Sequence, residues 1–218
     1  MQQPSVIAID GPAGAGKSTL GALLAARLGY LYFDTGVMYR ALTLAAMRAG
    51  LELHDGAALE ALAARVPIEV LPAAERDGRQ ATVRLAGQDV TWAIREREVE
   101  RNVSQVAAHP GVRRELVRQQ QSIGARGRVV MVGRDIGTVV MPAAELKIFL
   151  EASLDERARR RSHERSETAP VQHMRDEIAR RDALDQHVLR PAADAVVLST
   201  DGLSPDDELA WVLAYLAK

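Results

Sequence analysis

Close to its start the chain reads Gly11-Pro12-Ala13-Gly14-Ala15-Gly16-Lys17-Ser18-Thr19, which fits the phosphate-loop pattern G-x-x-x-x-G-K-[S/T]. Glycines at these positions let the backbone curve tightly, so that successive N–H groups can point at phosphate oxygens. Lys17 supplies a cation for the β- and γ-phosphates, and the Ser18 hydroxyl can hold Mg²⁺. The stretch therefore predicts a site for a nucleoside triphosphate.

The segments on either side of this loop support that interpretation. Residues 5–9 read as a buried strand, and residues 17–28 read as a helix with leucines along one face. The N-terminus of that helix would add the positive end of its dipole to the phosphate site. A glycine-rich turn that binds nothing is the alternative, and the strand before the loop and the helix after it argue against it.

Composition limits the class of protein. The chain has 218 residues, of which 47% are hydrophobic, and this is enough to bury the core of a domain. The formal net charge of −1 argues against a general nucleic-acid or membrane surface. There is no cysteine, and the five histidines lack ligand-like spacing, so we expect neither disulfides nor a structural metal. The sequence has no secretory signal and no apolar run long enough to span a membrane, so we expect a cytoplasmic protein without a membrane partner. We also expect a monomer with no nucleic-acid partner.

Strands and helices alternate along most of the chain. Beyond the first strand and helix, strands are expected at residues 30–33, 129–132, 146–150 and 195–198, and helices at 37–48, 94–107, 110–123, 154–164, 173–184 and 205–216. This alternation predicts an α/β fold built on a mostly parallel sheet with helices on both faces.

Residues 51–90 break the alternation. A helix is expected over residues 57–65, followed by strands at 68–70 and 81–85 and a turn at 87–89. We interpret this segment as a small antiparallel insertion, which could equally act as a lid or as an interaction surface.

Arginines are concentrated at positions 157, 159, 160, 161 and 165. Such a run is usually a solvated helix face, and we keep that as the default interpretation. Arginines beside a triphosphate loop would also suit charge neutralisation, because guanidinium groups pair with phosphate oxygens. Arg157 and Arg161 lie four residues apart on one helix face, and we expect them to act on ATP. Residues 162–171 are polar and predict a mobile loop between two helices.

A second anion site is indicated after the strand at residues 30–33. Asp34-Thr35-Gly36 leads into a helix that carries Tyr39 and Arg40 near its start. Ligands in open α/β sheets bind at the carboxyl ends of strands, which favours a functional role for these residues. The alternative is a helix cap followed by a surface arginine.

The loop Gly133-Arg134-Asp135-Ile136-Gly137 follows the strand at residues 129–132. It therefore also stands at the carboxyl end of a predicted strand, where substrate contacts are favoured. The competing interpretation is a local ion pair between Arg134 and Asp135 on a turn.

A phosphate loop alone indicates nucleotide binding rather than one reaction. GTPase switches usually carry N-K-x-D for guanine, and this chain has none. Motor or regulatory ATPases usually have a long apolar strand with an acidic end, whereas the strand at 129–132 ends in Gly-Arg-Asp. A small-molecule kinase needs a second anion site and arginines that neutralise the transferred group, and the sequence offers both.

Five segments together resemble bacterial cytidylate kinases. They are residues 9–19, Asp34-Thr35-Gly36-Val37-Met38-Tyr39-Arg40, Ser104-Gln105-Val106-Ala107, Gly133-Arg134-Asp135-Ile136-Gly137-Thr138-Val139-Val140 and Arg181-Asp182-Ala183-Leu184-Asp185. Their order and spacing match over almost the whole chain. The first motif is shared by many kinases, whereas the second and fourth are far more specific. Adenylate and thymidylate kinases would carry different residues after the third strand.

The resemblance implies a P-loop kinase fold in one domain of residues 1–218. Within it, residues 51–90 would form the insertion that binds the nucleoside monophosphate, and residues 157–175 would form a short lid. It also implies transfer of the γ-phosphoryl group of ATP to CMP or dCMP, with Mg²⁺ as the metal.

Positions carried over from the family give the phosphate and ribose contacts. Three arginines would hold the phosphate of CMP, namely Arg40, Arg134 and Arg181. Asp185 would contact the ribose. The catalytic cations would be Lys17, Arg134 and Arg181.

The same resemblance gives three residues that would read cytosine, namely Ser104, Arg113 and Asp135. A carboxylate accepts from the 4-amino group of cytosine and repels the 4-carbonyl group of uracil, which suits Asp135 to this role. Thr35 and Tyr39 would help to shape the acceptor pocket.

Two positions depart from the family pattern. The residue before Gly133 is usually acidic and is Val132 here, and an arginine usually stands where this chain has Val188. These departures are the only hint of a nucleotide-binding regulator without catalysis. A kinase of another pyrimidine monophosphate, UMP or dTMP, is the nearer alternative.

Overall fold

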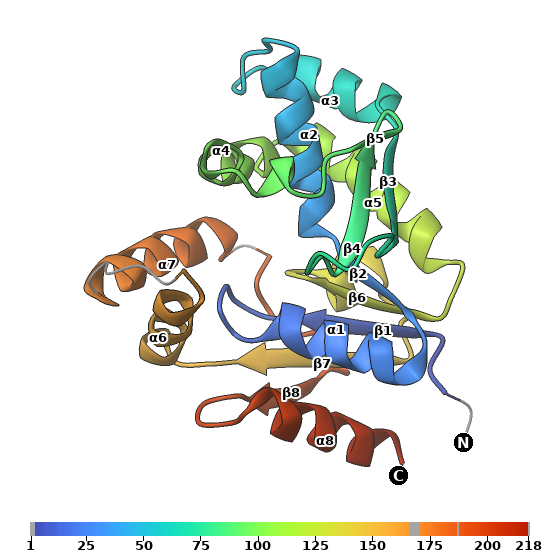
Figure 1. Ribbon diagram of the computed structural model, residues 1–218, viewed down its shortest axis with the longest axis vertical. Coiled ribbons are helices and arrows are strands. Elements are labelled where there is room, and N and C mark those ends of the chain that lie inside the picture. The colour runs from blue at the N-terminus through green and yellow to red at the C-terminus, as the bar shows by residue number, and fades with distance from the viewer. Residues whose placement is uncertain (1–2, 166–170, 187, 218) are drawn as a thin grey trace. The chain divides into compact units, whose positions relative to one another are not determined.

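The computed structural model describes residues 3–165, 171–186 and 188–217. The chain divides into two compact units (Figure 1). The first consists of Met1–Tyr30 and Arg128–Lys218, and the second of Leu31–Gly127. Among the residues so described, no helix is long and apolar enough to cross a membrane.

Parallel strands form the centre of the first unit. They are β1 (Val6–Asp10), β6 (Val129–Gly133), β7 (Leu146–Glu151) and β8 (Val196–Ser199), in the spatial order β6-β1-β7-β8. β1 pairs with a neighbour on each side, and all its residues are buried. A parallel strand in this position has no solvent face, which explains its continuous apolar run. The predicted parallel sheet is confirmed.

Helix α1 (Lys17–Leu28) begins and ends at the predicted residues. Gly16 and Gly29 flank it with left-handed backbone conformations, at φ 93° and 66°. Helix α8 (Pro205–Leu216), which packs against α1, also has its predicted bounds. Its start is fixed by a capping box, in which the side chains of Ser204 and Asp207 accept from each other's backbone N–H groups.

Helices α6 (Leu154–Arg165) and α7 (Val171–Asp185) lie side by side (Figure 1). Their contact is a small apolar cluster formed by Leu154, Ala158, Met174 and Ile178. The loop prediction is wrong for residues 162–165, because α6 continues to Arg165. Arginine and glutamate are good helix formers, so this solvated last turn can be helical without an apolar face. Residues 166–170, the rest of that predicted loop, lie outside the described residues.

The second unit begins with β2 (Leu31–Asp34), α2 (Gly36–Arg48) and α3 (Gly56–Arg65). A small antiparallel sheet follows, formed by β3 (Ile68–Pro72), β4 (Ala81–Leu85) and β5 (Gln88–Asp89) in the order β3-β4-β5. It confirms the predicted antiparallel segment, although β5 occupies residues that were expected to form a turn.

The helix expected over residues 94–107 is interrupted. A short 3₁₀ turn, η1 (Ala93–Arg95), is followed by an extended residue, Glu96, and then by α4 (Arg97–Ala107). Helix α5 (Pro110–Gly124) starts with proline at a position where no helical N–H bond is required, and it packs against α3.

Aliphatic side chains fill most of the core in both units. The largest fully buried side chains include Ile7, Ile9, Leu20, Leu24 and Met131 in the first unit, and Phe33, Met38, Leu42, Ile94 and Leu116 in the second.

Candidate active site

The loop between β1 and α1 depends on its glycines. Gly11, Gly14 and Gly16 have φ values of 146°, 78° and 93°, which residues with a side chain rarely adopt. Space is also lacking. A Cβ atom on Gly11 would lie 2.4 Å from the carbonyl oxygen of Leu150, and one on Gly14 would lie 3.0 Å from the Cβ of Arg157.

The start of α1 suits a bound anion. Its N-cap is Gly16, so no N-cap side chain occupies the first N–H groups of the helix. The Nζ of Lys17 reaches back over the loop and donates to the carbonyl oxygen of Pro12 at 2.6 Å. Ser18 is exposed in the first turn of the helix. These features fit the triphosphate of a nucleotide, with a hydroxyl at hand for Mg²⁺.

Asp10 is a residue that sequence reasoning did not single out. It ends β1 and is 5% exposed. Its two carboxylate oxygens accept from the N–H groups of Ile136 and Gly137, each at 2.7 Å. Burial raises the pKa of Asp10 to about 6, although these hydrogen bonds and the charge of Lys17 oppose the rise. The signal in the sequence was a lone carboxylate at the end of an otherwise apolar strand.

Asp10 thereby fixes the segment that follows β6. There Ile136–Val140 forms a single π-helical turn, η2, in which the carbonyl oxygen of Asp135 accepts from Val139 N at 2.8 Å and from Val140 N at 3.1 Å. Asp135 itself is buried. The predicted loop is therefore an ordered turn, held from the neighbouring strand.

Arg134 lies against the phosphate loop. Its Nη1 donates to the carbonyl oxygen of Gly11 at 2.8 Å. A local ion pair with Asp135, the competing interpretation, does not account for this bond. Arg134 is thus close to the backbone that would hold the donor phosphates.

Arg157 also contacts the phosphate loop. Its Nη1 donates to the carbonyl oxygen of Ala13 at 3.2 Å and to Asp182 Oδ2 at 2.6 Å. It is 7% exposed, so a solvated helix face does not describe it. That default does describe Arg159, whose side chain is 63% exposed and whose bonds go to Glu156. Arg161 is half-buried on the same helix.

An open hollow of about 570 Å³ lies beside the loop in the first unit. Its lining includes Pro12 of the phosphate loop, Phe149 of β7, Leu189, Pro191 and Asp201. Pockets of this size accommodate small organic ligands such as nucleosides.

In the second unit, two predicted acceptor residues meet. The guanidinium carbon of Arg113, on α5, lies 6.0 Å from the centroid of the Tyr39 ring on α2. Thr35 is buried at the N-cap of α2, and the carboxylate of Asp34 accepts from Gly36 N at 2.9 Å. The first N–H group of α2 is thus bonded to the side chain of Asp34, and the Thr35 side chain makes no N-cap hydrogen bond.

The other predicted acceptor residues are distributed over three helices. Arg40 and Ser104 are half-buried on α2 and α4. Arg181 and Asp185 belong to α7, and their side chains lie outside the described part of the structure. Between them, Asp182 accepts from Arg157.

Known proteins match the chain along almost its full length. A family model described as cytidylate kinase matches residues 7–218. The cytidylate kinase of Chloroflexus aggregans (strain MD-66 / DSM 9485) is 63% identical over 216 residues, covering 98% of this chain and 94% of that protein. The chain belongs to the cytidylate kinase family. The cytidylate kinase of Roseiflexus castenholzii (strain DSM 13941 / HLO8) is 57% identical over 221 residues, covering 100% of this chain and 95% of that protein.

Membership of the cytidylate kinase family confirms the resemblance carried by the five motifs. The departures at Val132 and Val188 do not take the chain out of the cytidylate kinase family. Val132 is buried in β6 opposite Ile9, in an apolar setting.

A solved structure supports the fold alone. A gluconokinase from Sinorhizobium meliloti 1021 aligns with a TM-score of 0.53 at 15% identity, covering 100% of this chain and 94% of that chain. The α/β kinase fold thus extends beyond the cytidylate kinase family.

Proposed function

We propose that this chain transfers the γ-phosphoryl group of ATP to CMP or dCMP, which gives ADP and CDP or dCDP. The observation that carries the proposal is membership of the cytidylate kinase family over residues 7–218, with relatives of that name at 63% and 57% identity. We further expect the protein to act as a cytoplasmic monomer, without a nucleic-acid or membrane partner.

The donor ATP would be held by the phosphate loop, residues 11–19. Backbone N–H groups and Lys17 would bind its phosphates, and Arg157 and Arg161 would add positive charge from α6. The hollow beside Pro12 has the size that a nucleoside requires. Mg²⁺, held by Ser18, would neutralise charge on the β- and γ-phosphate oxygens.

The acceptor phosphate would be held by Arg40, Arg134 and Arg181. The transition state of phosphoryl transfer spreads negative charge over the transferred group, so catalysis rests on alignment and neutralisation. Lys17, Arg134 and Arg181 would supply that neutralisation. The bond from Arg134 to Gly11 supports its role, because it keeps this guanidinium beside the donor loop.

The base and sugar would be recognised by polar side chains. Asp135 would accept from the 4-amino group of cytosine, while Arg113 and Ser104 would donate to its O2 and N3 atoms. Asp185 would contact the ribose. Tyr39 and Thr35 would shape the pocket, and the approach of Arg113 to the Tyr39 ring supports grouping these two residues.

A coupled assay with ATP against CMP, dCMP, UMP, dTMP and AMP tests the proposal. Each polar group left unpaired by the wrong base costs about 1–3 kcal/mol, so two such groups predict a preference for CMP over UMP of about 30-fold or more in kcat/KM. Preference for UMP or dTMP would instead show a kinase of another monophosphate. Absence of turnover with every acceptor would show a regulator.

A further inference from the structure

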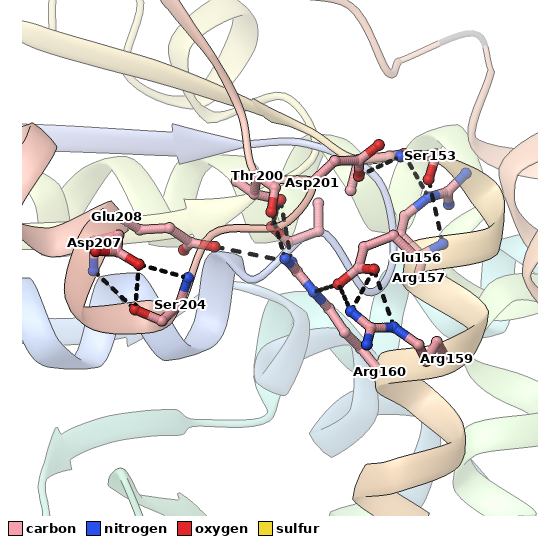
Figure 2. Close-up of polar contacts among 12 residues, drawn as sticks. Ser153, Glu156, Arg157, Arg159, Arg160, Thr200, Asp201, Ser204, Asp207 and Glu208 are labelled. Atoms are coloured by element: carbon pink, nitrogen blue, oxygen red, sulfur yellow. Dashed lines mark hydrogen bonds and ion pairs between the residues drawn. The ribbon is translucent and has the colours of Figure 1, made fainter.

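Arg160 belongs to the arginine-rich face of α6, but its guanidinium is directed into the protein (Figure 2). Its Nε donates to Glu156 Oε1 at 2.8 Å, its Nη1 to Thr200 Oγ1 at 3.1 Å, and its Nη2 to the carbonyl oxygen of Thr200 at 2.6 Å. All three nitrogens therefore have acceptors within the protein. Arg157 bonds within the protein through its Nε and Nη1, so Arg160 differs from it in that its Nη2 is bonded there as well.

Thr200 connects Arg160 to the phosphate loop. It follows β8 and is fully buried, and its hydroxyl oxygen lies 3.3 Å from the carbonyl oxygen of Ala15 and 3.2 Å from that of Glu151. The hydroxyl accepts from Arg160 and has one hydrogen to donate. The hydroxyl hydrogen can be donated to either carbonyl oxygen. That of Glu151 already accepts from Thr200 N at 2.8 Å, so a hydroxyl bond to Ala15 gives each of the two carbonyl oxygens a donor from Thr200.

Glu208 approaches the next residue of the loop from α8. Its carboxylate is 2% exposed, and its Oε1 lies 3.8 Å from Arg160 Nη1. Its two oxygens would lie 3.2 and 3.3 Å from a Cβ atom on Gly16. Arg160 Nη1 would lie 3.5 Å from the same Cβ. The cluster of Arg160, Thr200 and Glu208 is thus within hydrogen-bond distance of the loop at Ala15, through Thr200, and lies beside it at Gly16, the two residues before Lys17.

A phosphate loop needs such support from outside. It binds phosphate through backbone N–H groups, and its glycines leave that backbone with more freedom than other residues would. Donors act on a transition state when their orientation is fixed before the reaction, which requires groups that hold them without touching the substrate.

We propose that Arg160 is a positioning residue for the phosphate loop. Through Thr200 and Glu208 it holds the backbone at Ala15 and Gly16, and so the start of α1 with Lys17, without contacting ATP. The inference rests on the proposed use of ATP. It gives Arg160 a role different from that of Arg157 on the same helix.

The first test compares Arg160→Gln with Arg159→Gln. Both arginines bond to Glu156, but only Arg160 reaches Thr200. We expect Arg160→Gln to raise the KM for ATP and lower kcat, each by about tenfold, and to leave the KM for CMP within about twofold. Arg159→Gln should behave as wild type. Equal ATP parameters in the two variants, or an equal rise in the KM for CMP, would overturn the proposal.

The second test uses Thr200 and separates positioning from direct binding of phosphate. Thr200→Val keeps the shape and removes the hydroxyl, whereas Thr200→Ser keeps the hydroxyl. We expect Thr200→Val to raise the KM for ATP as Arg160→Gln does, and Thr200→Ser to keep the wild-type KM. The double variant Arg160→Gln/Thr200→Val should have a KM for ATP and a kcat close to those of either single variant. An unaffected valine variant, or fully additive effects, would show that Arg160 contacts the nucleotide itself.

The third measurement separates this inference from the proposed reaction. Calorimetric titration with ADP and Mg²⁺, without an acceptor, should show about tenfold weaker binding by Arg160→Gln and Thr200→Val at unchanged secondary structure by circular dichroism. If wild type binds ADP but does not phosphorylate CMP, the proposed function fails and the positioning role is still decided by these affinities. The positioning role of Arg160 would be overturned by equal ADP affinity in all variants, or by no ADP binding in wild type.

Discussion

At the scale of single residues, Lys17 combines a position in the phosphate loop with a bond back to the carbonyl oxygen of Pro12. Its charge should matter more as the γ-phosphoryl group departs than in the resting complex. We expect Lys17→Ala to lower kcat by about 100-fold or more while the protein still folds. Steady-state turnover at saturating ATP, with circular dichroism as the control, checks this. Near-normal turnover would contradict the assignment of the loop.

Asp135 is buried after β6, where it could either read the base or orient Arg134. Asp135→Ala distinguishes these roles. If Asp135 reads cytosine, the ratio of kcat/KM for CMP to that for UMP should fall sharply, chiefly because kcat/KM for CMP decreases. If Asp135 only orients Arg134, kcat/KM should fall by the same factor for both substrates. The ratio measured in wild type and variant decides, and an unchanged ratio would exclude the base-reading role.

Glu208 predicts a pH dependence of stability. Burial raises its pKa from 4.5 to about 7, although the charge of Arg160 opposes the rise. The folded protein therefore binds this proton more tightly than the unfolded chain, and the free energy of unfolding falls as pH rises from about 4.5 to about 7. At about 1.4 kcal/mol per pKa unit, the loss approaches about 3 kcal/mol.

Glu208→Gln should remove this contribution. Relative to wild type, the variant should gain stability between pH 5 and pH 8, as measured by urea unfolding at both values. Asp10, whose pKa is also raised, titrates in both proteins and cancels from the comparison. The same difference in unfolding free energy at both pH values would contradict the prediction.

At the scale of elements, α6 presents arginines in different settings. Arg157 joins α6, α7 and the phosphate loop through its bonds to Asp182 and Ala13. We expect Arg157→Gln to lower kcat by about tenfold or more with little change in the KM for CMP, because a cation beside the donor phosphates is lost. Arg161→Gln should act in the same direction. Kinetics with ATP and CMP varied in turn measure this, with Arg159→Gln as the control; an effect confined to the KM for CMP would count against the donor-side role.

The same helix shows where local pattern fails. Its bounds were predicted to within one residue, but the loop expected from residue 162 overlapped its last turn, because polar composition also indicates a loop. Charge patterning also could not rank the arginines. Arg157 and Arg159 are two residues apart and equally charged, and the packing of α7 and the phosphate loop around one side of α6 buries one and exposes the other.

At the scale of the whole molecule, the sequence predicted the order and type of nearly every element. The bounds of α1, α8 and β4 were correct because glycine, proline and capping residues mark them locally. Lys17 was singled out by the phosphate-loop pattern and Arg134 by the family resemblance, and their roles at the site remain predictions. Contacts between distant segments left no such signal. Glu208 lies close to Gly16 although the two residues are 192 positions apart in the sequence, and no pattern near either residue predicts this approach.

Asp10 has one further consequence. Its backbone leads directly into the phosphate loop, which is proposed to bind ATP. Its carboxylate holds the turn that follows Arg134 and Asp135, the residues proposed to bind CMP. A displacement of the end of β1 by one nucleotide would be transmitted through these two bonds to the residues proposed for the other. The two binding equilibria would then share a coupling free energy, and reciprocity requires ATP to alter the affinity for CMP by the same factor as CMP alters that for ATP.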